Sequence, residues 1–301
     1  MSILVGFPPN RRGRSVLSLA AMLARSSGDS LVVCTVVPAP WMPGLNRLDT
    51  EYLAYTDKLA ERALAQARAE LPPDVSAEFI AVKARSGPHG LLEAAEEHQA
   101  TMIAVGSSTA GLFGHITLSS VADRLLHSSP IPVAMATRGF RPGDADTVAR
   151  LTVAYGGTEQ SDQVLAAARD IAGRLGASLR LASFAVQLSP PDTALFRTEA
   201  AEVASDWVKD IKAAAHRAFQ AGLEPGQVVP ELEIVVGHGH DWSHALEDVE
   251  WRDGDILVVG SSDAAPIARV FLGSHAAKII RHSPVPVLVI PRAVAHEQAE
   301  T

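Results

Sequence analysis

The 301-residue sequence has little cysteine, few aromatic residues and no surplus of positive charge. The single cysteine, Cys34, excludes a disulfide framework and any CxxC metal site. Lysine and arginine together number 26 against 34 acidic residues, which gives a formal net charge of −8. Because a nucleic-acid-binding protein normally carries a basic face, we do not expect nucleic acid as a partner.

Long hydrophobic runs are also missing from the sequence. The longest apolar stretch, residues 31–45, is interrupted by prolines and a glycine, so it cannot form a membrane-spanning helix. At the start of the chain, the apolar residues 3–5 precede a group of arginines, which is the reverse of the order in a secretion signal. We therefore expect a soluble, cytoplasmic protein without a membrane partner.

Two common phosphate-binding motifs are absent as well. The sequence contains neither GxxxxGK[ST] nor GxGxxG, which excludes P-loop chemistry and the usual dinucleotide fingerprint. Any nucleotide site in this chain must be built in another way.

The sequence does contain an internal repeat. Residues 102–110 (MIAVGSSTA) match residues 256–264 (ILVVGSSDA), 154 positions later. Residues 28–31 match residues 176–179 at the shorter spacing of 148, which places a small insertion between residues 185 and 230. A period of about 150 residues is too long for a solenoid repeat and indicates a duplicated domain.

Each half alternates short apolar runs with amphipathic stretches. The runs are rich in valine, isoleucine and alanine, as expected of strands in a parallel sheet that is covered on both faces. These predicted strands are residues 2–6, 31–37, 77–82, 102–105 and 132–135 in the first half, and 151–155, 179–185, 231–236, 256–259 and 285–290 in the second. Residues 16–25 and 53–71 carry apolar residues at helical spacing, and Gly28 follows the first of them as a helix stop.

This alternation of strands and helices predicts right-handed βαβ crossovers. We therefore predict an α/β protein of two tandem, doubly wound, Rossmann-like domains, each with a five-stranded parallel sheet. The first domain spans residues 1–139 and the second spans residues 150–295, with a Pro-Gly-Asp-containing linker at 140–149.

The loops after the fourth strands are the candidate ligand sites, because ligands of open parallel sheets bind beyond the carboxyl ends of the strands. In the second half this loop begins Gly260-Ser261-Ser262-Asp263 and ends nine residues later with Gly273-Ser274-His275, which open a helix. Glycines let the backbone approach an anion, and the N–H groups of a helix start can receive it. Taken alone, the pattern is better explained by a strand end and a helix cap, but its recurrence in the first half favours a ligand site.

Both halves resemble the universal stress protein family, whose nucleotide-binding members carry G-x-x-G-x9-G-[S/T]. The starts SILVGF and LTVAYG and the ends HSSPIPVAM and RHSPVPVLVI also match the family, so the resemblance covers essentially the whole chain. It implies the fold of the adenine nucleotide α-hydrolase-like superfamily, with the strand order 3-2-1-4-5. It also implies antiparallel pairing of the fifth strands, 132–135 and 286–290, so that the monomer mimics a family dimer. Whether two such monomers also associate into a homodimer is left open by the resemblance.

The nucleotide-site residues implied by this resemblance are only partly kept. In the second half they are Gly260, Ser261, Asp263, Gly273, Ser274 and His275. The aspartate at 263 replaces the second glycine of the family motif. Its charge should weaken the binding of a polyphosphate unless a metal ion lies between them. The resemblance implies ATP or a related adenine nucleotide as the candidate cofactor of this half, and magnesium is expected only together with the nucleotide.

The first half departs further from the family motif. Its corresponding residues are Gly106, Thr109, Ser119 and Ser120. Both glycines after the first are lost here, and a β-branched threonine tolerates a left-handed turn poorly. The aspartate that the family's nucleotide binders place after the first strand is also missing from both halves, at Pro8 and Gly156. We expect a degenerate first site and an eroded second one.

Histidines are densest between residues 237 and 244, where His238, His240 and His244 occur. The last two are four residues apart, as zinc ligands on a helix can be, but no HExxH frame is present. Because the corresponding loop of the first half carries one histidine, His89, we interpret the segment as the polar start of a helix and expect no metal site.

Cysteine and tryptophan are expected to have structural roles. Cys34 lies within a predicted strand and is interpreted as a small buried apolar residue. The tryptophans are scattered, which favours packing or interface positions over a base-stacking row; they are Trp41, Trp207, Trp242 and Trp251.

Three functions remain open. The first is a non-catalytic stress-response regulator that binds an adenine nucleotide in its second half. The second is an interaction or scaffold protein of the same family that has lost nucleotide binding. The third is an enzyme of the wider superfamily. This alternative is the weakest, because no general base or metal cluster recurs at the ligand face, and we expect a weak ATPase at most.

Overall fold

The computed structural model describes residues 1–9, 13–39, 47–108, 112–143, 145–186, 194–221, 232–261 and 274–291. Strands and helices alternate along both halves of the chain. The first half contains β1 (Ser2–Gly6), α1 (Arg14–Ser27), β2 (Ser30–Pro38), α2 (Arg47–Glu70), β3 (Ala77–Ala84), α3 (Gly87–Glu97), β4 (Ala100–Gly106), α4 (Ser120–Ser128) and β5 (Val133–Ala136). The second half contains β6 (Arg150–Ala154), α5 (Glu159–Leu175), β7 (Ser178–Val186), α6 (Ala194–Ala221), β8 (Glu233–Gly239), α7 (Trp242–Glu247), β9 (Asp255–Gly260), α8 (Ser274–His282) and β10 (Val287–Ile290).

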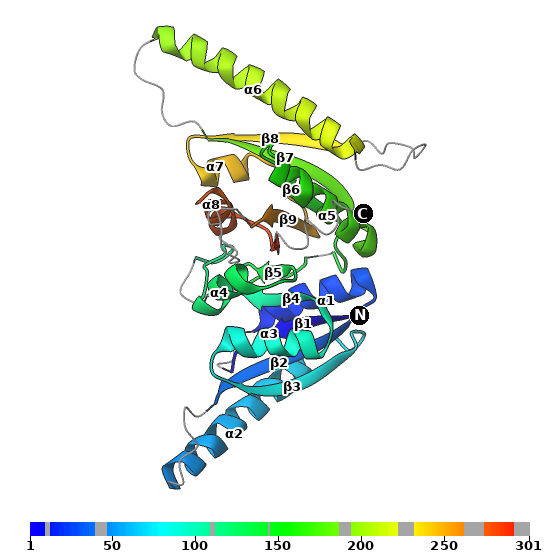
Figure 1. Ribbon diagram of the computed structural model, residues 1–301, viewed down its shortest axis with the longest axis vertical. Coiled ribbons are helices and arrows are strands. Elements are labelled where there is room, and N and C mark those ends of the chain that lie inside the picture. Colours follow the sequence, from blue (N-terminus) through cyan, green and yellow to red (C-terminus); the bar gives the residue numbers. More distant parts are fainter. Residues whose placement is uncertain are drawn as a thin grey trace.

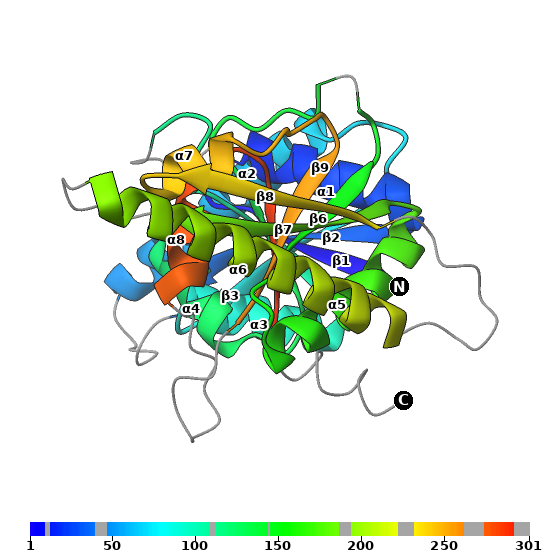
Figure 2. The ribbon, with the colours of Figure 1, turned by 90° about the horizontal axis from the view of Figure 1, so that it is seen from above.

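The ten strands form one continuous sheet in the order β3-β2-β1-β4-β5-β10-β9-β6-β7-β8. Within each half the order is therefore 3-2-1-4-5, and all of the strand pairs inside a half are parallel. The two halves follow one another along the long axis of the molecule, with α2 and α6 at opposite ends (Figure 1). Seen along that axis, the strands fan across one another, as the right-handed twist of a sheet requires (Figure 2). The predicted fold class is confirmed.

The halves meet through their fifth strands. β5 and β10 pair antiparallel, with Val133 opposite Val289 and Ala134 opposite Leu288. This confirms the predicted antiparallel pairing, and each fifth strand is the edge of its own half. An apolar edge strand would otherwise expose unpaired backbone groups, and the pairing covers both edges at once.

Two helical layers bury the sheet. One hydrophobic cluster joins α1, α2, α5 and α6 to one face of the sheet, and a second cluster joins α3, α4, α7 and α8 to the other. Both clusters contain residues of both halves. The protein therefore has a core that is continuous across the junction of the halves.

Local sequence signals explain how the first helix of each half begins or ends. Gly28 closes α1 and Gly176 closes α5, each with a left-handed backbone (φ of 74° and 63°), as predicted for Gly28. Thr158 and Ser161 form a reciprocal capping box at the start of α5.

The outermost strands differ from the sequence prediction. We expected every strand to be apolar and covered on both faces, but β3 alternates between half-buried and exposed residues, and β8 is mostly half-buried. The reason is that β3 and β8 are the two edges of the ten-stranded sheet, where each has one neighbour only. Both also extend beyond their predicted ends, to Ala84 and Gly239.

Two further bounds follow from simple physical causes. The fifth strands begin at Val133 and Val287, later than predicted, because the prolines before them have no N–H for the ladder. α6 is longer than α2, 28 residues against 24, in the region where an insertion was expected. None of the helices in the described ranges is both long and apolar enough to cross a membrane.

Candidate functional site

A cavity of about 690 Å³ lies in the second half, where β6 and β9 end. These two strands are neighbours in the sheet, and the chain leaves them toward opposite sides, so the cavity sits at the topological switch point of this half. Its lining residues are Ala154, Tyr155, Gly156, Thr158, Gln160, Ser161, Val164, Phe184, Val186, Trp207, Trp242, Val259, Gly260, Ser261, His275, Ala276 and Ile279. The volume falls within the range of about 300–1,000 Å³ that is usual for small-molecule sites.

The structure brings three of the predicted site residues together at this cavity. Gly260, Ser261 and His275 line it, and α8 begins at Ser274. Asp263 and Gly273 lie outside the described residues.

Gly260 has a packing reason to be glycine. A Cβ atom at this position would lie 2.4 Å from Cγ2 of Val164 on α5, which is too close for any side chain. At Gly106, its counterpart in the first half, the nearest atom of Val16 would be 3.8 Å away, an ordinary contact. Helix-to-strand packing therefore requires the glycine at 260, whether or not a ligand binds.

The backbone N–H of Ser261 is committed to the sheet. It donates to the carbonyl of Ile290 at 3.1 Å, and Ser107 makes the corresponding bond to Ala136 at 3.2 Å in the first half. Ser261 is one of the predicted nucleotide-site residues, but its backbone N–H group is not available to a ligand. The contribution of Ser261 to a ligand would have to come from its side chain.

An aromatic wall is the feature that the sequence interpretation missed. Tyr155, Phe184, Trp207 and Trp242 all line the cavity, and the rings of Trp242 and His275 lie 5.5 Å apart. Trp207 and Trp242, for which we expected packing or interface positions, lie in the lining of this cavity. Trp242 is the first residue of α7, three positions after β8 ends at the ligand edge of the sheet, and that position is a signal that could have identified it. Trp207 lies on α6, far from any motif.

Trp251 has the packing role that was expected. Its Nε1 donates to the carbonyl of Leu246 at 2.7 Å, and the guanidinium of Arg180 lies 5.3 Å from its ring centre. Trp41 lies outside the described residues.

Among the described lining residues of the large cavity, none is a lysine, arginine, aspartate or glutamate. The phenol of Tyr155 donates to Oδ1 of Asp162 at 2.6 Å. Burial raises the pKa of Tyr155 well above its usual range, and the bond to the Asp162 carboxylate adds to the shift. The cavity is therefore mainly apolar, with hydroxyl, amide and imidazole groups at its rim.

The corresponding cavity of the first half is smaller, at about 290 Å³. It is lined by Gly6, Phe7, Pro8, Pro9, Val16, Cys34, Val36, Gly87, Leu91, Val105, Gly106, Ser107, Ser108, Ser119 and Val121. Cys34 is fully buried there, as predicted, and burial raises the pKa of its thiol to about 12.

Several polar groups of the described part of the loop beside this smaller cavity, residues 107–108 and 112–119, bond to one another. The hydroxyl of Ser107 accepts from the N–H of Thr117 at 2.8 Å, and the N–H of Ser108 donates to the Thr117 carbonyl at 2.7 Å. Ser119 accepts from the N–H of Ala122 at 3.1 Å as the N-cap of α4, which starts at Ser120. Thr109 lies outside the described residues. These bonds occupy the N–H groups of Ser108 and Thr117 and the side-chain oxygens of Ser107 and Ser119.

The predicted helix starts after the third strands are confirmed. Asp241 is the N-cap of α7 and accepts from the N–H of His244 at 3.0 Å. Ser86 caps α3 in the same way by accepting from the N–H of His89.

The fold and the cavity together define a class of protein. It is a tandem, Rossmann-like α/β protein in which a mainly parallel sheet carries a ligand-sized cavity at the switch point of its second half. A sequence model of the Universal stress protein family matches residues 1–137 and again residues 147–291. The chain belongs to the universal stress protein family and contains two copies of its domain in tandem.

Relatives of similar length support this assignment. Universal stress proteins of Mycobacterium tuberculosis and Mycobacterium bovis are each 37% identical over 298 residues, covering 97% of this chain and 100% of theirs. Among solved structures, a universal stress protein from Archaeoglobus fulgidus has a TM-score of 0.58 at 21% identity, covering 96% of this chain and 98% of its own. A putative universal stress protein from Pseudomonas aeruginosa has a TM-score of 0.57 at 18% identity, with coverages of 99% and 96%. These structural similarities concern the fold.

Proposed function

We propose that this protein is a non-catalytic regulator that binds an adenine nucleotide in the large cavity of its second half. The observation that carries the proposal is the aromatic wall of a cavity of about 690 Å³ at the switch point of a Rossmann-like sheet. A purine base is flat and apolar on its faces, and stacking on an aromatic side chain contributes about 1–3 kcal/mol per base. Trp242 and His275, whose rings already lie together, are the proposed contacts of the base or ribose.

The polar rim of the cavity fits the remainder of a nucleotide. Thr158, Gln160 and Ser161 lie at the start of α5, and Ser261 lies at the end of β9. The hydroxyls of Thr158 and Ser161 already bond to each other and to the backbone in the capping box of α5. The amide of Gln160 and the hydroxyl of Ser261 are therefore the proposed contacts of ribose hydroxyls and phosphate oxygens. We further propose that the first half does not bind nucleotide, because its cavity is smaller and the adjoining loop uses its own donors.

The second candidate is a scaffold protein without a nucleotide. The observation that favours it is the lack of any charged side chain among the described residues that line the large cavity, since a triphosphate needs positive charge nearby. If this candidate holds, the protein should bind neither ATP nor AMP.

Calorimetric titration distinguishes the two candidates. We expect one equivalent of ATP or AMP to bind to the full chain, and denaturation of freshly purified protein to release an adenine nucleotide. Titrations of ATP with magnesium and with a chelator would show whether the metal accompanies the polyphosphate. ATP turnover above the background rate would favour the enzyme alternative instead.

Matched variants locate the site within the chain. His275→Ala and Trp242→Ala remove the paired rings and should each weaken binding about 5-fold or more, in line with the loss of a stacking contact. Val121→Ala changes the residue of the first half that corresponds to His275, and it should leave the affinity unchanged. Absence of binding in the unaltered protein, or equal losses in His275→Ala and Val121→Ala, would contradict the proposal.

A further inference from the structure

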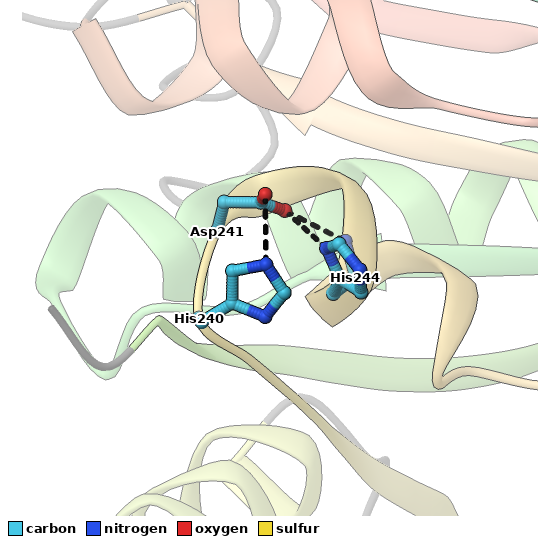
Figure 3. A group of neighbouring side chains, drawn as sticks. All are labelled: His240, Asp241 and His244. Carbon is cyan, nitrogen blue, oxygen red and sulfur yellow. Dashed lines mark hydrogen bonds and ion pairs between the residues drawn. The ribbon is translucent and has the colours of Figure 1, made fainter. Parts of the chain in front are cut away.

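Three side chains that can ligate a metal meet at the start of α7. Nε2 of His240 lies 3.4 Å from Oδ2 of Asp241, and Nδ1 of His244 lies 2.8 Å from Oδ1 of the same carboxylate. The two imidazole rings are 3.8 Å apart, centre to centre (Figure 3). One ligating atom from each side chain lies within 4.8 Å of the others.

The backbone explains why these residues meet. β8 ends at Gly239, and a Cβ atom there would lie 2.3 Å from the backbone nitrogen of Ala245, so the chain reverses tightly against the new helix. Asp241 then caps that helix and receives the N–H of His244. His240 precedes the cap, and His244 lies one turn into the helix, so both rings reach the same carboxylate.

We propose that His240, Asp241 and His244 form a binding site for one divalent transition-metal ion, with zinc as the representative ion. Histidine nitrogens and carboxylate oxygens are ordinary zinc ligands, and three protein ligands leave one position for water or an external ligand. A tetrahedral ion with bonds of about 2.0–2.1 Å holds its ligand atoms roughly 3.3–3.4 Å apart. The three side chains are exposed, and their ligating atoms must draw together from separations of up to 4.8 Å to reach that spacing.

The carboxylate can serve the helix and the ion together. Its Oδ1 accepts the N–H of His244 at 3.0 Å, while Oδ2 faces His240. An ion held by Oδ2 would therefore leave the cap of α7 in place.

Helix capping alone does not account for these residues. The first half starts α3 with Ser86 as its cap, and the positions that correspond to the other two are Arg85 and His89. A neutral serine therefore performs the capping there, and one histidine of the pair is replaced by a cation. The complete set of three ligands belongs to the second half.

Neighbouring acidic residues have other partners in the structure. Glu247 accepts the hydroxyl of Ser243 at 2.9 Å, and Asp248 accepts the backbone N–H of His238 at 2.9 Å. Neither belongs to the group of three. None of the three ligands is among the described residues that line the large cavity, so we expect zinc to bind without added nucleotide.

Zinc titration of chelator-treated, untagged full-length protein tests the proposal. Calorimetry, or competition with a chromophoric chelator, should give one equivalent of bound zinc without added nucleotide. Cobalt in place of zinc adds an independent signature, because tetrahedral cobalt absorbs strongly in the visible range while octahedral aqueous cobalt does not.

Three variants and one control identify the ligands. Asp241→Asn keeps an oxygen that can cap α7 but removes the charged ligand. His240→Gln and His244→Gln each remove one nitrogen. Even the loss of a residue that only supports a metal ligand weakens binding about 10- to 100-fold, so each variant should lose 10-fold or more. His89→Gln, the matched change in the first half, should bind as tightly as the unaltered protein.

The zinc titrations of the variants either support or overturn the proposed site. One equivalent of zinc that is lost in all three variants and kept in His89→Gln supports the site. No stoichiometric binding overturns it, and so does binding that persists in Asp241→Asn and His244→Gln, because the ion would then be held by other histidines. Circular dichroism of each variant shows that a loss of binding is not a loss of folding.

Discussion

Arg150 and Asp255 face each other in register across β6 and β9, and the guanidinium donates two hydrogen bonds to the carboxylate, at 3.0 and 2.7 Å. The Asp255 side chain is almost completely buried. Arg180, which is equally buried, places Nη2 at 3.8 Å from the same carboxylate, and that nitrogen has no hydrogen-bond partner among the residues that the structure describes. One buried carboxylate thus balances two arginines, with Glu233 at the edge of the group.

The first prediction follows from this imbalance. Asp255→Ala leaves two buried guanidinium groups without their main counter-charge, and breaking a buried ion pair in this way costs about 3–5 kcal/mol. We expect a loss of that size in the free energy of unfolding, measured by urea denaturation. Glu250→Gln breaks only the exposed pair with Arg252 and should cost less than about 1 kcal/mol. Similar losses in the two variants would contradict the prediction.

The second prediction uses the first half as a template. Ser2 and Val32 hold the positions of Arg150 and Arg180 there, and Ala100 pairs with Ser2 as Asp255 pairs with Arg150. The register of the first half shifts at the next pair, Ile3 with Met102, a shift that the second half lacks. The triple variant Arg150→Ser, Arg180→Val, Asp255→Ala removes all three charges together. Because replacing a whole buried ionic group costs less than removing one partner, the triple variant should be more stable than Asp255→Ala. A triple variant less stable than Asp255→Ala would show that the arginines act mainly by packing.

Much of the fold could be predicted from the sequence because its signals are local. The duplication, the apolar strand runs and glycines such as Gly28 lie within short segments, and the strand order came with the family resemblance. The buried group of Arg150, Arg180 and Asp255 could not be predicted, because it joins three strands far apart in the chain. The cavity wall was missed for the same reason: Trp207 reaches it from α6 and Trp242 from the start of α7.

The third prediction concerns the reactivity of Cys34. Burial raises the pKa of its thiol to about 12, so the reactive thiolate is scarce in the folded protein at pH 8. Compared with an ordinary thiol of pKa about 8.5, the thiolate fraction falls roughly a thousand-fold. Cys34 should therefore resist an aromatic disulfide reagent in the native protein and react at once in urea. Immediate stoichiometric labelling without denaturant would show that the strand opens readily.

The fourth prediction is that the two halves unfold as one unit. Leu288 of β10 is fully buried and lies opposite Ala134 of β5, in the cluster that spans both halves. Leu288→Ala should cost about 2–5 kcal/mol, as is usual for a buried leucine. Cys34 labelling reports on the first half, and tryptophan fluorescence in a Trp41→Phe background reports on the second.

Both of these probes should shift to the same lower urea midpoint in Leu288→Ala. Leu112 is 75% exposed, so Leu112→Ala serves as the control and should leave the midpoint unchanged. Separate midpoints for the two probes would show that the β5–β10 junction does not couple the halves.

The last prediction is a loss of stability at alkaline pH caused by Tyr155. Burial, and then the hydrogen bond to Asp162, raise its native pKa above that of an unfolded tyrosine, which is about 10. Below pH 10 the phenol is protonated in both states and contributes no pH dependence. Above pH 10 the unfolded chain releases this proton and the native protein keeps it, so the free energy of unfolding falls by up to about 1.4 kcal/mol per pH unit.

Tyr155→Phe removes this slope and, at neutral pH, costs about 0.5–1.5 kcal/mol for the lost hydrogen bond. The two proteins are compared by urea denaturation from pH 8 to 11, so that the effects of all other titrating groups cancel. The difference between their free energies of unfolding should be constant up to about pH 10 and should become smaller above it. If the difference instead stays constant over the whole pH range, Tyr155 ionises as easily in the native protein as in the unfolded chain. That result would contradict the prediction.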